Sequence, residues 1–106
     1  MEKSDFIWFD GEFVDWDSAQ INVMTHTLHY GTGVFEGVRA YKTEKGAAIF
    51  RLDDHTDRLF EAAAKLSIEI PYSRDELNEV QKEIFKINNL EEGYLRPIVY
   101  LGSESL

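Results

Sequence analysis

Short hydrophobic runs separated by polar residues stand at the start of the chain. Residues 7–9 and 12–14 flank Asp10-Gly11, a residue pair typical of the two-residue turn of a β-hairpin. The spacing of the apolar side chains in residues 21–24 predicts a further short strand that leads to His26. We therefore expect the chain to open with a hairpin followed by a third strand.

Three later segments have strand composition. Residues 34–42 are rich in aromatic and β-branched residues, and a polar turn at 43–46 leads into a strand at 47–51. Residues 94–101 form another apolar run, which Pro97 interrupts. Because proline cannot donate a ladder hydrogen bond, Pro97 favours an edge or bulged position.

Two segments have helical spacing. Asp53 is the expected N-cap of a helix that runs through Leu66, and Ser73 with Glu76 forms a capping box for a second helix that ends near Asn88. The apolar repeats are Leu59, Ala62, Ala63 and Leu66, then Leu77, Val80, Ile84 and Ile87. The element order predicts an α+β fold, in which an antiparallel sheet is opened by a β-hairpin and two helices pack on one side.

Length and charge narrow the functional classes. The 106 residues are expected to form a single domain, 1–106, and no apolar run is long enough to cross a bilayer. The net charge of −9 argues against a nucleic-acid partner. The chain has no cysteine and no visible secretory signal, so we expect a cytoplasmic location.

The segment from His26 to Tyr41 carries most of the candidate chemistry. It reads His-Thr-Leu-His-Tyr-Gly-Thr-Gly-Val-Phe-Glu-Gly-Val-Arg-Ala-Tyr. Glycine at 31, 33 and 37 suggests positive φ angles or a close approach of the backbone to a ligand. His26 and His29, with His55 or one of the many acidic residues as a third ligand, could hold zinc, but hydrogen-bonded structural histidines are the preferred interpretation. The glycines and β-branched residues oppose a helix at this place.

Two arginines each have two interpretations. Arg58 either pairs with Asp54 on a solvated helix face or binds a phosphate group with its planar fork of donors. Arg96 stands in an apolar strand and needs an anionic partner, which is either Glu36 or the carboxylate of a substrate.

The glycine-rich segment closely resembles that of the branched-chain amino acid aminotransferases, which are pyridoxal phosphate enzymes of the class IV aminotransferase family. The resemblance continues through residues 7–14, Ile49-Phe50-Arg51-Leu52, the helix that contains His55 and Arg58-Leu59, and Tyr94-Leu95-Arg96-Pro97. It spans nearly the whole chain and implies the smaller N-terminal domain of such an enzyme. The implied reaction is amino transfer between leucine, isoleucine or valine and 2-oxoglutarate.

The resemblance also implies roles for individual residues. Arg58 would bind the phosphate of pyridoxal 5'-phosphate, which requires it to face the glycine-rich segment. Arg96 would receive the side-chain carboxylate of bound glutamate, and Tyr30 would reach into the pocket of a neighbouring subunit. The remaining assignments are Phe35, Gly37 and Tyr94 at the substrate pocket, with Glu36 and Arg39 supporting the site.

In enzymes of this family the lysine that forms the Schiff base belongs to a larger second domain, which we expect to follow Leu106. None of the six lysines present, Lys3, Lys42, Lys45, Lys65, Lys82 and Lys86, matches it. We therefore expect no catalytic residue and no activity in this chain alone. The expected partners are amino acids, 2-oxo acids, and either further copies of the chain or the second domain.

Two other functions stay open from the sequence. One is a stand-alone interaction or regulatory module derived from a truncated aminotransferase. The other is a binding protein for small acids that uses Arg96.

Overall fold

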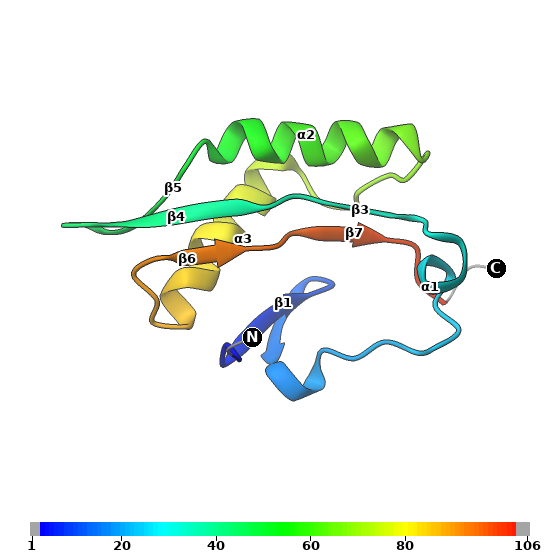
Figure 1. The fold of residues 1–106 in the computed structure, drawn as a ribbon, viewed down its shortest axis with the longest axis horizontal. Helices are drawn as coiled ribbons and strands as arrows, with labels where there is room; N and C mark the ends of the chain where they lie inside the picture. Colours follow the sequence, from blue (N-terminus) through cyan, green and yellow to red (C-terminus); the bar gives the residue numbers. More distant parts are fainter. Residues whose placement is uncertain (1–2, 104–106) are drawn as a thin grey trace.

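The chain opens with the expected hairpin in the computed structural model, which describes residues 3–103 (Figure 1). Strand β1 (Phe6–Phe9) pairs antiparallel with β2 (Glu12–Asp15) across the Asp10-Gly11 turn, so the hairpin prediction is confirmed. A single 3₁₀ turn, η1 (Trp16–Ser18), follows. The expected domain end at Leu106 lies outside the described residues.

The segment after the hairpin differs from the expectation. Residues 21–24 lie in an exposed loop instead of a strand, and α1 (His26–Tyr30) is a short helix where the sequence opposed one. Tertiary contacts account for this helix, because the first two backbone N–H groups of α1 donate to the carbonyl oxygens of Gly102 and Leu101 at 3.2 Å each. Gly31 ends the helix in the left-handed conformation at a φ of 66°.

Each of the two long strands is split into two shorter ones. The expected strand 34–42 forms β3 (Gly33–Phe35) and β4 (Val38–Thr43), and the expected strand 94–101 forms β6 (Gly93–Leu95) and β7 (Ile98–Tyr100). Strand β3 pairs with β7, whereas β4 pairs with β6 and with β5 (Gly46–Ile49). All of these pairings are antiparallel, as expected.

The two interruptions lie opposite each other. Glu36-Gly37 separates β3 from β4, and Arg96-Pro97 separates β6 from β7. Proline supplies no N–H here, but its carbonyl oxygen still accepts a hydrogen bond from the backbone N–H of Glu36 at 3.0 Å. Pro97 thus lies between β6 and β7, each an edge strand of its sheet, in agreement with the predicted edge or bulged position.

Helix α2 (Leu52–Lys65) begins two residues earlier than the sequence suggested. Its N-cap is Arg51, in the left-handed conformation at a φ of 52°, and not Asp53, which lies in the first turn. The Arg51 side chain instead donates from Nε to Asp54 at 2.7 Å. Acidic residues in this first turn still favour the helix through its dipole.

Helix α3 (Arg74–Ile87) has the N-terminus that the sequence predicted. The backbone N–H of Glu76 donates to Oγ of Ser73 at 3.1 Å, and the backbone N–H of Ser73 donates to the Glu76 carboxylate at 3.1 Å. The capping box is confirmed.

Replacing Ser73 with alanine is expected to lower the free energy of unfolding by about 1 kcal/mol, because an N-terminal N–H of α3 loses its acceptor. Ser73→Asp, which keeps an acceptor oxygen at the N-cap in place of the hydroxyl, is the matched control, with an expected loss of at most a few tenths of a kcal/mol. Urea unfolding followed by circular dichroism measures both. Equal losses for the two variants would contradict this role of the hydroxyl.

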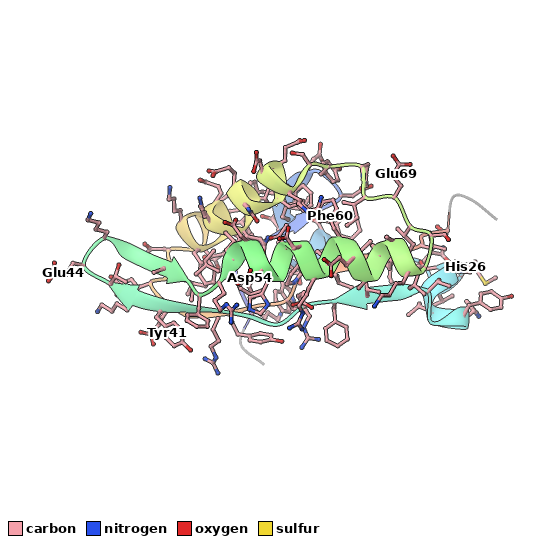
Figure 2. All side chains as sticks on the ribbon, turned by 90° about the horizontal axis from the view of Figure 1, so that it is seen from above. His26, Tyr41, Glu44, Asp54, Phe60 and Glu69 are labelled. Carbon is pink, nitrogen blue, oxygen red and sulfur yellow. The ribbon has the colours of Figure 1, made fainter. Side chains whose placement is uncertain are left out.

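The described strands form three antiparallel sheets, ordered β1-β2, β3-β7 and β5-β4-β6. Helices α2 and α3 pack against them, and the core lies between these two helices and the strands. Helix α2 packs on α3 and β3, and α3 packs on β1 and β5. Figure 2 shows Tyr41 on β4 pointing away from α3. The buried apolar side chains are Val38, Ala40, Leu52, Leu59, Ala63, Leu77 and Phe85. The α+β prediction, with an antiparallel sheet and two packed helices, is confirmed.

The hairpin is attached to the end of α3 by one side chain. The backbone N–H of Phe6 donates to Oδ1 of Asn88 at 2.8 Å, and Nδ2 of Asn88 donates to the carbonyl oxygen of Phe6 at 3.1 Å. Near the other end of α3, the ring of Trp8 meets that of Tyr72 edge-on at 5.1 Å between centroids. Within residues 3–103, no helix combines the length and hydrophobicity that a membrane span requires.

Candidate functional site

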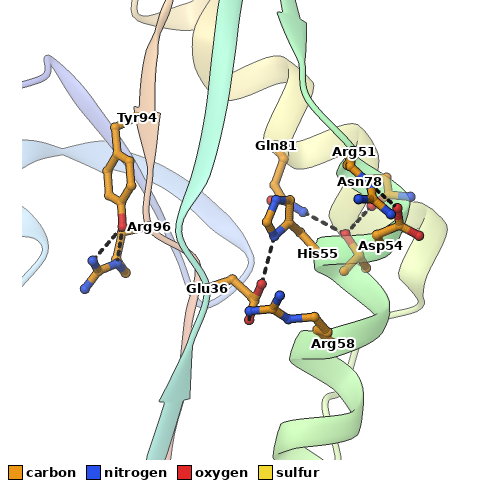
Figure 3. Close-up of polar contacts among 10 residues, drawn as sticks. Glu36, Arg51, Asp54, His55, Arg58, Asn78, Gln81, Tyr94 and Arg96 are labelled. Atoms are coloured by element: carbon orange, nitrogen blue, oxygen red, sulfur yellow. Dashed lines mark hydrogen bonds and ion pairs between the residues drawn. The ribbon is translucent and has the colours of Figure 1, made fainter.

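The alternation of side chains divides the glycine-rich segment between two faces of the sheet. Phe35, Gly37 and Arg39 lie on the outer face, whereas Glu36 and Val38 are buried on the face toward α2. Figure 3 shows Glu36 on one side of this strand and Tyr94 with Arg96 on the other. The candidate residues therefore form two groups.

The first group is the Glu36 cluster, which consists of Glu36, His55 and Arg58 (Figure 3). Nδ1 of His55 lies 2.8 Å from Oε1 of Glu36, and Nη2 of Arg58 lies 3.2 Å from Oε2. Because a carboxylate only accepts hydrogen bonds, both nitrogens donate. Each oxygen of Glu36 thus has its own donor from α2.

Burial differs sharply within the Glu36 cluster. The Glu36 side chain is 7% exposed and that of His55 is 22% exposed, whereas 69% of the Arg58 side chain is accessible. Arg58 nevertheless faces the glycine-rich segment, as the resemblance requires. Its guanidinium carries five N–H donors, so the single bond to Glu36 leaves donors for an anion from solvent.

Packing of α2 on α3 fixes the helix that carries His55 and Arg58. Between these two residues, buried Thr56 donates its hydroxyl to Oδ1 of Asn78 on α3, and Nε2 of Gln81 donates to Thr56 at 3.3 Å. These bonds hold the register of α2 against α3. The positions of His55 and Arg58 relative to the sheet follow from it.

The second group is the Tyr94 cluster on the outer face, which consists of Phe35, Gly37, Tyr94 and Arg96. The Tyr94 hydroxyl accepts hydrogen bonds from Nε of Arg96 at 3.1 Å and from Nη2 at 2.6 Å. The same guanidinium lies 4.2 Å from the centroid of the Phe35 ring, a cation–π distance. Arg96 is thus held between two aromatic side chains at the surface.

Gly37 provides the space in which the Tyr94 ring lies. A Cβ atom at position 37 would be 2.5 Å from the Tyr94 hydroxyl oxygen and 3.2 Å from two ring carbons. Any side chain at this position would therefore displace the ring. Glycine at position 37 is explained by this close approach.

Two ion pairs that the sequence left open as alternatives are not formed among the described residues. Arg58 pairs with Glu36 and not with Asp54, which binds Arg51. The Arg96 guanidinium binds the Tyr94 hydroxyl and not Glu36, because the two side chains leave the sheet on opposite faces (Figure 3).

Arg39 lies next to the Tyr94 cluster, whereas Tyr30 lies far from both clusters. Arg39 is paired with Tyr94 across β4 and β6 and is exposed on the same face. Tyr30 lies on α1, at the opposite end of the molecule from β6 (Figure 1), with its ring 4.5 Å from that of His26. The structure therefore brings the Tyr94 cluster together and leaves Tyr30 apart from it.

The histidines are hydrogen-bonded, as the preferred interpretation had it. Nδ1 of His26 lies 2.8 Å from the Thr32 hydroxyl, and Nε2 of His29 donates to the carbonyl oxygen of Val23 at 2.7 Å. Across residues 3–103, histidines and carboxylates form no group of three suited to a metal ion.

His55 is the residue whose contact the sequence reasoning missed. The sequence suggested a possible zinc ligand at this position, and its spacing of three residues from Arg58 predicts that both side chains lie on one side of α2, but it named no partner for His55. The alternation of residues 34–42 is the signal that could have paired them with Glu36. Chemically, each cluster presents guanidinium donors of a kind that suits an anion, from Arg58 in the first and from Arg96 in the second.

Comparison with known proteins gives a consistent result. The family model described as amino-transferase class IV matches residues 33–106. The branched-chain-amino-acid aminotransferase of Pseudomonas aeruginosa is 56% identical over 105 residues, which are 99% of this chain and 34% of that protein. The enzyme of the same name from Escherichia coli K12 is 44% identical over 95% of this chain and 33% of its own length.

Solved structures agree. The T.th. branched-chain amino acid aminotransferase, complexed with N-(5'-phosphopyridoxyl)-L-glutamate, superimposes with a TM-score of 0.95 at 44% identity, covering 100% of this chain and 36% of that one. The Escherichia coli enzyme gives a TM-score of 0.91 over 94% of this chain and 33% of its own. The chain therefore spans about a third of the length of the relatives it matches.

Proposed function

Because the chain belongs to the amino-transferase class IV family, we propose that it is the small N-terminal domain, 1–106, of a branched-chain aminotransferase. The proposed reaction moves an amino group between leucine, isoleucine or valine and 2-oxoglutarate, with pyridoxal 5'-phosphate as the cofactor. Relatives named for this activity, and a relative solved with a phosphopyridoxyl-glutamate adduct, support the proposal.

The observation that carries the proposal is the position of Arg58. Its guanidinium is accessible, is held by Glu36 of the glycine-rich segment, and offers paired donors to phosphate oxygens. Arg58 would hold the cofactor phosphate, and Glu36 would support it. When bound, pyridoxal phosphate supplies an electron sink for the substrate carbon that carries the amino group.

The Tyr94 cluster fits a pocket that accepts both apolar and acidic side chains. Phe35 offers an apolar ring to a branched side chain, and the Arg96 guanidinium beside it offers donors to the second carboxylate of glutamate or 2-oxoglutarate. Tyr94 would lie near the α-carboxylate, with Gly37 leaving it room and Arg39 supporting it from the neighbouring strand. A buried carboxylate without such a partner would be rejected.

Further parts of the proposed enzyme come from outside this chain. We assign the cofactor-binding lysine to a second domain, and we assign Tyr30, on its separate helix, to the pocket of a neighbouring subunit. The proposed assembly is therefore a homo-oligomer of the two-domain protein. Without the second domain, the 106-residue chain has no lysine that matches the one required for catalysis.

The test is amino transfer by the complete coding product compared with the 106-residue chain. With pyridoxal phosphate, leucine and 2-oxoglutarate supplied, the complete product is expected to form glutamate and the short chain to form none above background. Turnover by the short chain would overturn the inactivity prediction. A complete reading frame without a lysine-bearing domain would favour the interaction module instead.

A further inference from the structure

The contact between His55 and Glu36 has a consequence for how Arg58 meets an anion. We propose that His55 is a positioning residue: by occupying Oε1 of Glu36, it keeps the Glu36–Arg58 ion pair one-sided, so that the other donors of Arg58 remain available to a phosphate. This inference rests on the proposed function, because it assumes that Arg58 binds the cofactor phosphate.

Each of the two carboxylate oxygens of Glu36 needs an N–H donor. Its carboxylate is 7% exposed, and a buried carboxylate is stable only when its oxygens are paired. Arg58 alone could satisfy both oxygens, because guanidinium and carboxylate readily form two parallel hydrogen bonds. The observed contact is not of this form, since only Nη2 donates, at 3.2 Å, and only to Oε2.

His55 accounts for this one-sided contact. Its Nδ1–H donates to Oε1 at 2.8 Å, which is shorter than the Arg58 contact, and it approaches from the preceding turn of α2. A carboxylate held by His55 cannot rotate to present both oxygens to Arg58. The buried charge is satisfied, and one edge of the guanidinium is left over.

A phosphate requires the guanidinium donors of Arg58 that Glu36 does not occupy. A two-point contact with Glu36 would occupy the paired donors that fit phosphate oxygens, and would leave the phosphate beside an ion pair that is already complete. The present arrangement still restrains Arg58, whose free side chain has large rotamer entropy to lose on binding. His55 thus lets Glu36 restrain the Arg58 side chain while the remaining donors of Arg58 stay available to a phosphate.

The other groups near the cluster do not take over this role. Asp54, the acidic neighbour of His55 on α2, is bound to Arg51 at 2.7 Å. Asp57, the acidic neighbour of Arg58, is bound to Arg74 of α3 at 3.0 Å. Among the described residues, Glu36 is thus the carboxylate that pairs with Arg58, and the availability of Arg58 depends on how Glu36 is held.

The experiment compares cofactors with and without the phosphate. Dissociation constants of pyridoxal 5'-phosphate and of pyridoxal are measured by absorbance and fluorescence titration of the complete coding product after removal of its cofactor. His55→Phe keeps an aromatic ring at this position but removes the N–H donor. It is expected to weaken the binding of pyridoxal phosphate about tenfold, which corresponds to about one charge-assisted hydrogen bond, and to leave the binding of pyridoxal unchanged. The binding of inorganic phosphate, measured by competition, is expected to weaken in parallel.

Conservative and control variants separate positioning from folding. His55→Asn keeps an N–H near the place of Nδ1 and is expected to restore most of the affinity for pyridoxal phosphate. Asp54→Asn, an exposed neighbour outside the cluster, is expected to leave both constants unchanged. His55→Leu is the second donor-free variant if His55→Phe unfolds, and thermal unfolding of each variant checks the fold.

A double-mutant cycle tests the route through Glu36. In a Glu36→Gln background, His55→Phe is expected to have no further effect on the ratio of the two constants, because the carboxylate that His55 restrains is absent. The proposal is overturned if His55→Phe weakens both cofactors equally, or if its effect on the ratio persists in that background. If Arg58→Ala leaves the ratio unchanged, it is the proposed function that fails, since the phosphate then does not bind at Arg58.

Discussion

Replacement of Leu59 by alanine is expected to lower the free energy of unfolding by about 2–5 kcal/mol, as is usual for a leucine deleted from a packed core. Leu59 is 2% exposed and lies on α2 immediately after Arg58. The side chain is part of the layer where α2 packs on α3 and β3, so its loss leaves a cavity that rigid neighbours fill only in part. Chemical denaturation of the 106-residue chain measures the effect.

Leu66→Ala is the matched control for this prediction. Leu66 follows the last residue of α2 and is 43% exposed, so truncation removes less buried surface and is expected to cost under about 1.5 kcal/mol. Losses of the same size at both positions would mean that the core is not centred on the inner face of α2.

Replacing Gly37 with alanine is expected to raise the KM for 2-oxoglutarate by about tenfold to a hundredfold in the complete coding product. The new Cβ would meet the Tyr94 hydroxyl at 2.5 Å, so the ring must move and its two hydrogen bonds with Arg96 are lost. The expected range corresponds to the misplacement of Arg96 weakening one hydrogen bond to the substrate carboxylate, since a hydrogen bond to a charged group contributes about 1.5–3 kcal/mol. Steady-state kinetics with leucine as the amino donor measures it.

Tyr94→Phe is the partner variant for this test. It removes the hydroxyl, which is the atom nearest to the new Cβ, and also the acceptor for Arg96. The double variant Gly37→Ala with Tyr94→Phe is expected to be little worse than Tyr94→Phe alone, because both changes act through the same contact. Additive effects would show that Gly37 acts by another route, such as its own backbone. Thermal stability is expected to change little, since the ring lies at the surface.

Local patterns are sufficient for the elements that depend on neighbouring residues. The Asp10-Gly11 turn and the Ser73–Glu76 capping box are both identified correctly, because each is stabilised within a few residues. The short helix His26–Tyr30 is not, because its first N–H groups are satisfied by Leu101 and Gly102, far away in the sequence. Propensity cannot show such a contact.

The partners of charged side chains are the least predictable part of the site. Asp54 is the acid that the sequence offers to Arg58, yet Glu36, in a separate segment, is its partner. The alternation of residues 34–42 places Glu36 on the inner face, and this pattern would have excluded its pairing with Arg96. Which inner-face cation it meets depends on how α2 lies over the sheet, which is a property of the whole fold.

The Asn88 side chain has a consequence for how the molecule behaves at high concentration. Its amide binds both the N–H and the carbonyl oxygen of Phe6, so it imitates the neighbouring strand that β1 lacks at that end. An edge strand whose backbone N–H and C=O groups are unpaired can pair with a strand of another molecule, and such pairing leads to aggregation. At Phe6 the Asn88 amide occupies these backbone groups, and it does so without adding a charge or a further strand to the sheet.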